Sequence, residues 1–78
     1  MHKTEILQEQ FLNQCRSLRM PVTVFLVNGF QMRGVITGHD RFALLLEADG
    51  RQQMVYKHAV STVAPAQNLP LEGVSLPD

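Results

Sequence analysis

The stretch MVYKHAVSTV, residues 54–63, decides the fold of this 78-residue chain. It contains two short runs of mainly apolar and β-branched residues, a composition typical of β-strands, and only Lys57 and His58 separate them. Strands this short leave sheet edges with unpaired backbone groups, and such edges invite pairing with another chain. Head-to-tail pairing of one copy's edge with the next copy's edge would close a ring.

The residues before this stretch predict three further strands and two tight hairpins. Asn28-Gly29 and Asp49-Gly50 both predict hairpin turns, because these dipeptides accept the positive φ angles that tight turns need. Gly34 interrupts the second strand, as glycine does where a strand must bend sharply. So many short strands in about 45 residues predict a mainly β protein with a strongly bent small barrel. The five expected strands cover residues 22–27, 30–37, 42–48, 51–56 and 59–63.

An N-terminal α-helix is expected over about residues 4–18. Apolar residues recur at helical spacing from Leu7 to Leu18, which gives this helix one apolar face. Pro21 is expected to end the helix, because a proline disfavours helical geometry in the residue before it.

The chain is expected to form one folded domain, residues 1–65, and a short C-terminal tail, residues 66–78. The tail contains prolines and a glycine and shows no hydrophobic periodicity, so we expect it to be disordered. A chain of 78 residues is marginal for burying a core unless a disulfide, a metal or a partner subunit adds stability. Of these sources of stability, self-association with partner subunits is the one that the composition leaves open.

The composition excludes several classes of protein. The single cysteine, Cys15, permits no intramolecular disulfide and fits the reducing cytoplasm. One cysteine and three scattered histidines do not have zinc-ligand spacing, and we expect no metal and no cofactor. The longest apolar runs are far shorter than the roughly 20 residues that cross a membrane, and the N-terminus does not resemble a signal peptide. We therefore expect a cytoplasmic protein with no membrane contact.

The charge distribution points to nucleic acid, although the formal net charge is zero. Six cationic residues face only three anionic ones between residues 10 and 65, whereas both ends of the chain are acidic. A ring of several such basic domains would have a stronger positive field than one copy, and positive fields concentrate the phosphate backbone of nucleic acids.

These features together resemble one family. The chain is similar to Hfq, the family of bacterial Sm-like RNA chaperones, from about Leu7 to Pro65. A lone Tyr-Lys-His would be a weak signal, but a ten-residue block in order with the other motifs is specific. The matching segments are Leu7-Gln8, Phe11-Leu12-Asn13, Val27-Asn28-Gly29, Gly34, Asp40-Arg41-Phe42 and Met54 to Val63.

The resemblance implies a five-stranded Sm-like barrel behind the helix, assembled as a homohexameric ring. It implies single-stranded RNA as the partner: U-rich RNA on the helix-bearing face near the pore, and A-rich RNA on the opposite face. Members of the family bring small regulatory RNAs to messenger RNAs, in post-transcriptional regulation.

The implied pore-side site consists of Gln8, Arg41, Phe42, Lys57 and His58. Uridine recognition needs a flat group for stacking, polar groups for the base edge and positive charge for phosphate. Phe42 supplies the ring, while Gln8 and Lys57 can donate to a uracil carbonyl. From composition alone, Phe42 could be either a core aromatic or a stacking residue. His58 could be either a turn residue or a ligand contact. Arg41 departs from the glutamine or lysine common in the family, which leaves its type of contact open.

Tyr56 precedes this site and is expected to pack at the subunit boundary. The implied opposite-face site combines an apolar slot for a purine with an amide that can pair with the adenine edge. Alone, its aromatic and methionine residues also fit an ordinary core. The site consists of Phe25, Gly29, Phe30, Met32, Gln53 and Thr62.

The implied outer rim contains Arg16 and Arg19, fewer arginines than the rim patch of other members. Solvated helix charges are the alternative interpretation, and we expect weaker rim-dependent RNA annealing than in members with three rim arginines. His39 stands where the family often has an aromatic residue, and the loop at residues 47–51 is one residue longer than in many members.

Two other functions compete with this hypothesis. Catalysis is disfavoured because no serine or cysteine nucleophile accompanies Asp40 and the histidines, and the carboxylates do not converge as a metal-dependent nuclease requires. The second alternative is a monomeric small-barrel module that binds peptides in an aromatic groove. That module would be a monomer, whereas the Hfq-like hypothesis requires a ring.

Overall fold

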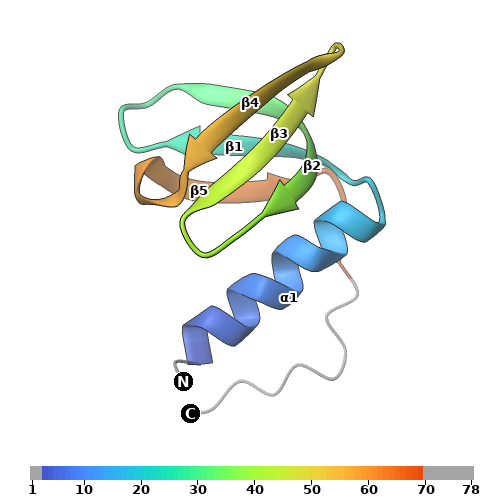
Figure 1. Ribbon diagram of the computed structural model, residues 1–78, viewed down its shortest axis with the longest axis vertical. Helices are drawn as coiled ribbons and strands as arrows, with labels where there is room; N and C mark the ends of the chain where they lie inside the picture. Colours follow the sequence, from blue (N-terminus) through green and yellow to red (C-terminus); the bar gives the residue numbers. More distant parts are fainter. Residues whose placement is uncertain (1–2, 70–78) are drawn as a thin grey trace.

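The computed structural model describes residues 3–69. One helix precedes five strands, so the mainly β fold with an N-terminal helix is confirmed (Figure 1). Each strand lies within one or two residues of its predicted range, because the turn-forming dipeptides define its ends. The elements are α1 (Lys3–Ser17), β1 (Pro21–Leu26), β2 (Gln31–His39), β3 (Ala43–Ala48), β4 (Arg51–Tyr56), the short 3-10 helix η1 (Lys57–Ala59) and β5 (Val60–Pro65).

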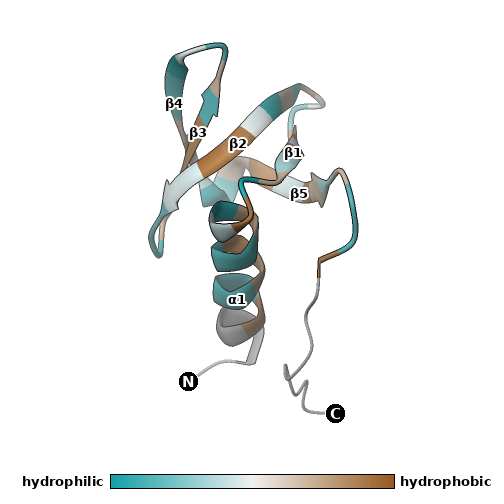
Figure 2. Ribbon diagram, turned by 90° about the vertical axis from the view of Figure 1, so that its right-hand side faces the viewer, coloured by the Kyte–Doolittle hydropathy of each residue, from teal (hydrophilic) through white to brown (hydrophobic). Residues whose placement is uncertain are grey.

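The five strands form one bent antiparallel sheet in the order β4-β3-β2-β1-β5. The helix lies on one side of the sheet, and the tip of the β3–β4 hairpin projects away from it in both views (Figures 1 and 2). Strands β4 and β5 are the two edges, and within this chain they do not pair with each other. The turn η1 connects one edge to the other.

The core lies between α1 and the concave side of the sheet. Figure 2 shows apolar and polar residues on different sides of α1, and its apolar side provides the buried Leu12 and Cys15. Alternate residues of β1, Val22 and Val24, point to the same core, as the two-residue period of a strand requires. The buried cluster is completed by Ile36, Leu44 and Leu46.

The end of α1 differs from the sequence-based expectation, because the helix stops before Pro21 has any effect. Met20 N–H donates to Cys15 O at 3.0 Å and Arg19 N–H donates to Arg16 O at 3.2 Å. This pair of bonds defines a Schellman motif, in which the residue after the helix adopts a left-handed conformation. Arg19 occupies that position with φ 48°, although glycine is the usual residue there. Met20 packs against the core cluster, which fixes the motif.

Two residues of the predicted tail contact the domain. Ala66 N–H donates to Pro21 O at 2.9 Å, and Leu69 packs against the core cluster. Residues 70–78 lie outside the described residues, so disorder of the tail remains a prediction.

The bend of the sheet depends on the close approach of β2 and β3 at Gly34. A Cβ atom placed on Gly34 would lie 2.5 Å from the backbone oxygen of Glu47 and 3.2 Å from Leu46 Cγ. A backbone oxygen in the middle of a paired strand cannot move away cheaply. Gly34 is therefore required for space, as its place in the strand pattern predicts.

We expect Gly34→Ala to lower the free energy of unfolding by about 1–3 kcal/mol, the usual cost of overpacking. Gly38→Ala is the matched control in the same strand, because a Cβ there would meet only the Leu45 side chain, with Cβ at 3.8 Å and Cδ2 at 3.9 Å. Thermal and urea denaturation of both variants measures the difference. Equal stability of the two variants would contradict the close-approach explanation.

Candidate nucleic-acid interface

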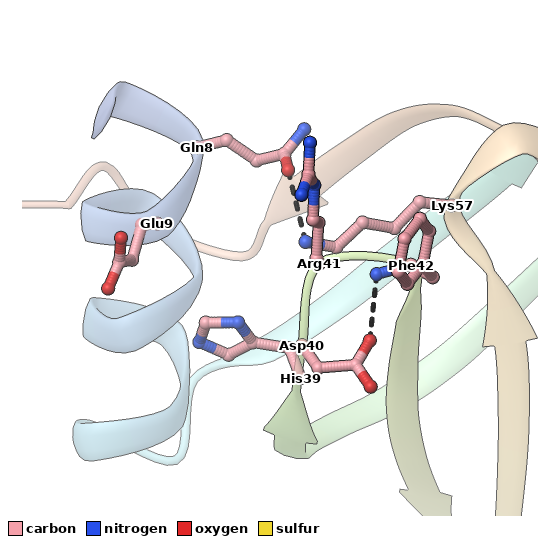
Figure 3. Close-up of a pocket in the computed structure, with 7 residues that line it drawn as sticks. All are labelled: Gln8, Glu9, His39, Asp40, Arg41, Phe42 and Lys57. Carbon is pink, nitrogen blue, oxygen red and sulfur yellow. Dashed lines mark hydrogen bonds between the residues drawn. The ribbon is translucent and has the colours of Figure 1, made fainter. Parts of the chain in front are cut away.

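A pocket of about 530 Å³ lies between α1, the β2–β3 turn and η1. Figure 3 shows its side chains converging from these three elements. Four of the five predicted pore-side residues are among them, although α1 and η1 are far apart in the sequence. The pocket is lined by Gln8, Glu9, His39, Asp40, Arg41, Phe42 and Lys57.

Asp40 builds the turn that holds Phe42 in place. Its Oδ1 accepts hydrogen bonds from the backbone N–H groups of Phe42 and Ala43, both at 2.8 Å. Asp40 N–H in turn donates to Ala43 O at 3.0 Å. Backbone donors stabilise the ionised carboxylate, and they hold the pKa of Asp40 below its usual value. The turn leaves the Phe42 ring 69% exposed, so Phe42 is a surface aromatic and not a core residue.

Lys57 connects this turn to the helix. Its backbone N–H donates to Phe42 O at 2.8 Å, and its Nζ donates to Gln8 Oε1 at 3.0 Å. Because the Gln8 oxygen is used by Lys57, the Gln8 amide NH₂ is the group left to offer a ligand. Gln8 and Lys57 therefore present hydrogen-bond donors on the same side of the pocket.

Arg41 adds a second cation beside the aromatic ring. Its guanidinium carbon lies 5.7 Å from the centroid of the Phe42 ring, within the range of a cation–π contact. The resulting surface combines a flat apolar face, amide and ammonium donors, and two positive charges. That combination suits a planar ring with carbonyl groups and an attached phosphate.

His58 does not line the pocket. Its ring stacks on Tyr56, with centroids 5.7 Å apart and planes inclined by 18°. Both rings are exposed, and Tyr56 belongs to the edge strand β4. The tripeptide Tyr56-Lys57-His58 therefore divides: Lys57 points to the pocket, and the two rings form a separate stacked pair.

The opposite-face set is only partly gathered within one chain. Phe25 pairs with Thr62 across β1 and β5, and the Gly29-Phe30 turn follows directly after β1. Phe30 is 70% exposed, and its N–H donates to Asn28 Oδ1 at 3.1 Å. Gly29 has φ 94°, a conformation that favours glycine.

The two remaining members lie apart from this group. Met32 pairs with Val24 and packs against the core, so it faces the other side of the sheet from Phe25. Gln53 lies on β4, which is separated from β1 by two strands. Strand pairing within one chain therefore does not bring Gln53 next to Phe25.

The two rim arginines are both exposed, Arg16 in the last turn of α1 and Arg19 in the Schellman turn. His39, to which the sequence pattern assigns no role, lines the pocket and bonds to Asn13 on α1. In the sequence, only its position between an alternating strand and the Asp40 turn indicates that His39 could belong to the site. Glu9 was also missed, because an acidic residue on a polar helix face carries no distinctive pattern.

Between residues 3 and 69 no three His, Cys, Asp or Glu side chains are grouped so that they could hold a metal ion. Within the same range, no helix has the length and apolar character needed to cross a membrane.

The N-terminal helix, the bent five-stranded sheet and the pocket beside the helix define an Sm-like domain. The family model described as "Hfq protein" matches residues 7–70. The RNA-binding protein Hfq of Anoxybacillus flavithermus is 57% identical over 72 residues, covering 92% of this chain and 97% of the relative. The Bacillus subtilis protein of the same name is 58% identical over 66 residues, covering 85% of this chain and 90% of the relative.

A solved structure agrees with these relatives. The 1.55 Å crystal structure of the pleiotropic translational regulator Hfq matches with a TM-score of 0.72 and 41% identity, covering 74% of this chain and 97% of that chain. The chain belongs to the Hfq family, which confirms the resemblance seen in the sequence. The chain therefore belongs to a family of RNA-binding proteins and not to a family of enzymes.

We expect the stability of the Asp40 turn to depend on pH in the acid range. Because the pKa of Asp40 is lowered in the folded state, its ionised carboxylate stabilises the fold at pH values above the unfolded-state pKa of 3.8. This stabilisation is lost as the pH falls through the folded-state pKa. Asp40→Asn keeps an acceptor oxygen but does not titrate. Urea denaturation should therefore show a larger stability difference at neutral pH than at a pH below 3.8. A difference of the same size at both pH values would contradict this explanation.

Proposed function

We propose that the protein is an RNA chaperone that acts as a homohexameric ring. It binds U-rich single-stranded RNA on the helix-bearing face and A-rich RNA on the opposite face, and it promotes pairing of small regulatory RNAs with messenger RNAs. The observation that carries the proposal is the pocket in which Phe42, Lys57 and Gln8 meet. The names of the relatives, which describe RNA-binding proteins, support the same class of ligand.

Uracil suits this pocket because its edge carries two carbonyl oxygens. A base stacked on the exposed Phe42 ring would present these acceptors to the Gln8 amide and the Lys57 ammonium. Cytosine presents an amino donor in place of one carbonyl, and two donors facing each other do not bond. Lys57 and Arg41 supply charge for the phosphate chain.

The unpaired edges of the sheet support the ring. An apolar groove of about 560 Å³ runs between α1 and β5, with Leu7, Phe11 and Val63 among its lining residues. The other edge carries two large exposed side chains, Met54 at 60% and Tyr56 at 53%. Strand β4 of one copy placed beside β5 of the next would pair both edges and cover these side chains. Because the two surfaces differ, the contact is head-to-tail and repeats until it closes.

The same arrangement would complete the A-rich site. Gln53 on β4 of one copy would approach Thr62 on β5 of the next, which is itself paired with Phe25. An aromatic slot with an amide at its edge is suited to adenine, whose edge offers one donor and one acceptor. Met32 faces the other side of the sheet from Phe25 and packs on the core, so we do not include it in this slot.

Binding of two RNAs by one ring brings them together at a high effective concentration, which is how such a ring would promote their pairing. Arg16 and Arg19 would add phosphate contacts at the rim. Two exposed arginines per subunit form a modest patch, and we propose a correspondingly modest contribution of the rim to annealing.

We expect Lys57→Ala to weaken oligo(U) binding by at least about tenfold, because it removes a charge-assisted donor and releases the Gln8 amide. The same variant should bind oligo(A) within about twofold of the wild-type protein. Phe30→Ala, on the other side of the sheet, should have the reverse effect. Fluorescence anisotropy at one fixed salt concentration measures the affinities of the wild-type protein and both variants for each oligonucleotide.

Lys57→Arg is the matched control, since it keeps the charge and removes only the ammonium geometry that contacts Gln8. It should retain phosphate-dependent affinity better than Lys57→Ala. Equal loss of both oligonucleotides in Lys57→Ala and in Phe30→Ala would refute two separate faces.

A further inference from the structure

His39 lies in the wall of the pocket, yet the proposed uridine contacts do not use it. It is the last residue of β2, and its Nε2 lies 2.8 Å from Asn13 Oδ1 on α1. Because an amide oxygen only accepts, Nε2 carries the proton and donates. The other ring nitrogen, Nδ1, has no hydrogen-bond partner within residues 3–69. Figure 3 shows the ring between α1 and the side chains of Arg41 and Lys57.

The protonation state of His39 decides the net charge of the pocket. Two carboxylates, Glu9 and Asp40, line the pocket together with two cations, Arg41 and Lys57. These four charges cancel, so the pocket is neutral while His39 is neutral. Protonation at Nδ1 gives the pocket a net positive charge and also converts Nδ1 from an acceptor into a donor.

The surroundings of His39 favour its neutral form in the free protein. Partial burial lowers the pKa of its imidazole, and the cations Lys57 on η1 and Arg16 on α1 lower it further. Glu9 on α1 and the adjacent Asp40 act in the opposite direction with smaller effects. A group in this state responds strongly to an added anion, because a negative charge nearby favours the protonated form.

We propose that His39 is a proton-linked phosphate contact of the helix-side RNA site. A backbone phosphate of the bound strand enters the pocket, Nδ1 takes up one proton from solvent, and the resulting N–H donates to a phosphate oxygen while Nε2 remains bonded to Asn13. The only bond that forms is the N–H bond at Nδ1, with a proton from solvent, and it breaks again when the RNA leaves and the proton returns to solvent. The assignment rests on the proposed function, since it requires RNA on this face.

The direction of the pH effect follows from linkage. The RNA-bound state has the higher His39 pKa, so affinity rises as the pH falls through the bound-state pKa and stops rising below the free-state pKa. A difference of about one pKa unit between the two states corresponds to a tenfold change in affinity. Helix-side RNA binding is therefore strengthened in mildly acidic conditions.

The experiment compares oligo(U) binding at about pH 8 and about pH 5.5, at constant ionic strength and with a pH-insensitive dye. Wild-type protein should bind about three- to tenfold more tightly at the lower pH. His39→Gln keeps a donor for Asn13 but cannot become charged, and it should lose most of this gain while matching wild type at the higher pH. His58→Gln is the matched control for the other histidine near this face, and it should retain the gain contributed by His39.

Three results separate the possibilities. If His39→Gln keeps the full pH gain, or if His58→Gln alone abolishes it, the assignment to His39 is overturned. If His39→Gln only lowers the melting temperature and leaves the pH gain intact, His39 is a structural link between α1 and β2 and the proposal fails. Absence of oligo(U) binding by wild-type protein at either pH would instead refute the proposed function itself. NMR titration of the His39 ring gives an independent readout, because oligo(U) should raise its pKa.

Discussion

Unpaired backbone groups on strands β4 and β5 are the constraint on which the rest of this structure depends. The sheet order leaves these strands at opposite edges, and no strand within residues 3–69 pairs with the outer side of either of them. Such edges are normally protected by charges, prolines or covering segments. Here they carry exposed Met54 and Tyr56 on one side and an apolar groove on the other. A surface of this kind is suited to a neighbour and poorly suited to water.

The short turn η1 belongs both to the sheet edges and to the helix-side pocket. It joins the two edge strands, and its first residue, Lys57, bonds both to the Phe42 turn and to Gln8 on the helix. Its last residue accepts a hydrogen bond from Val27 in the β1–β2 turn, at 2.9 Å. The helix-side pocket is assembled within one chain. In contrast, the opposite-face set is split between strands that do not pair within one chain, so in the proposed ring a neighbouring subunit would complete it.

Local patterns predicted the elements well, because turn dipeptides and hydrophobic periodicity act over a few residues. They failed where the deciding contact is not local. Arg19 ends the helix in a conformation that its residue type does not indicate, and packing of Met20 fixes that end. The contact between Gln8 and Lys57 joins residues 49 positions apart, so only the family resemblance could suggest it. The opposite faces of Phe25 and Met32 follow from strand register, which the sequence pattern alone did not define.

The central claim is that the edges of the sheet are closed by copies of the same chain. Light scattering coupled to size-exclusion chromatography measures this directly. A closed ring should appear as a single species of six times the 8.8 kDa mass of one chain, unchanged on dilution across the micromolar range. A stable monomer of 8.8 kDa would contradict it, and would favour the monomeric peptide-binding module instead.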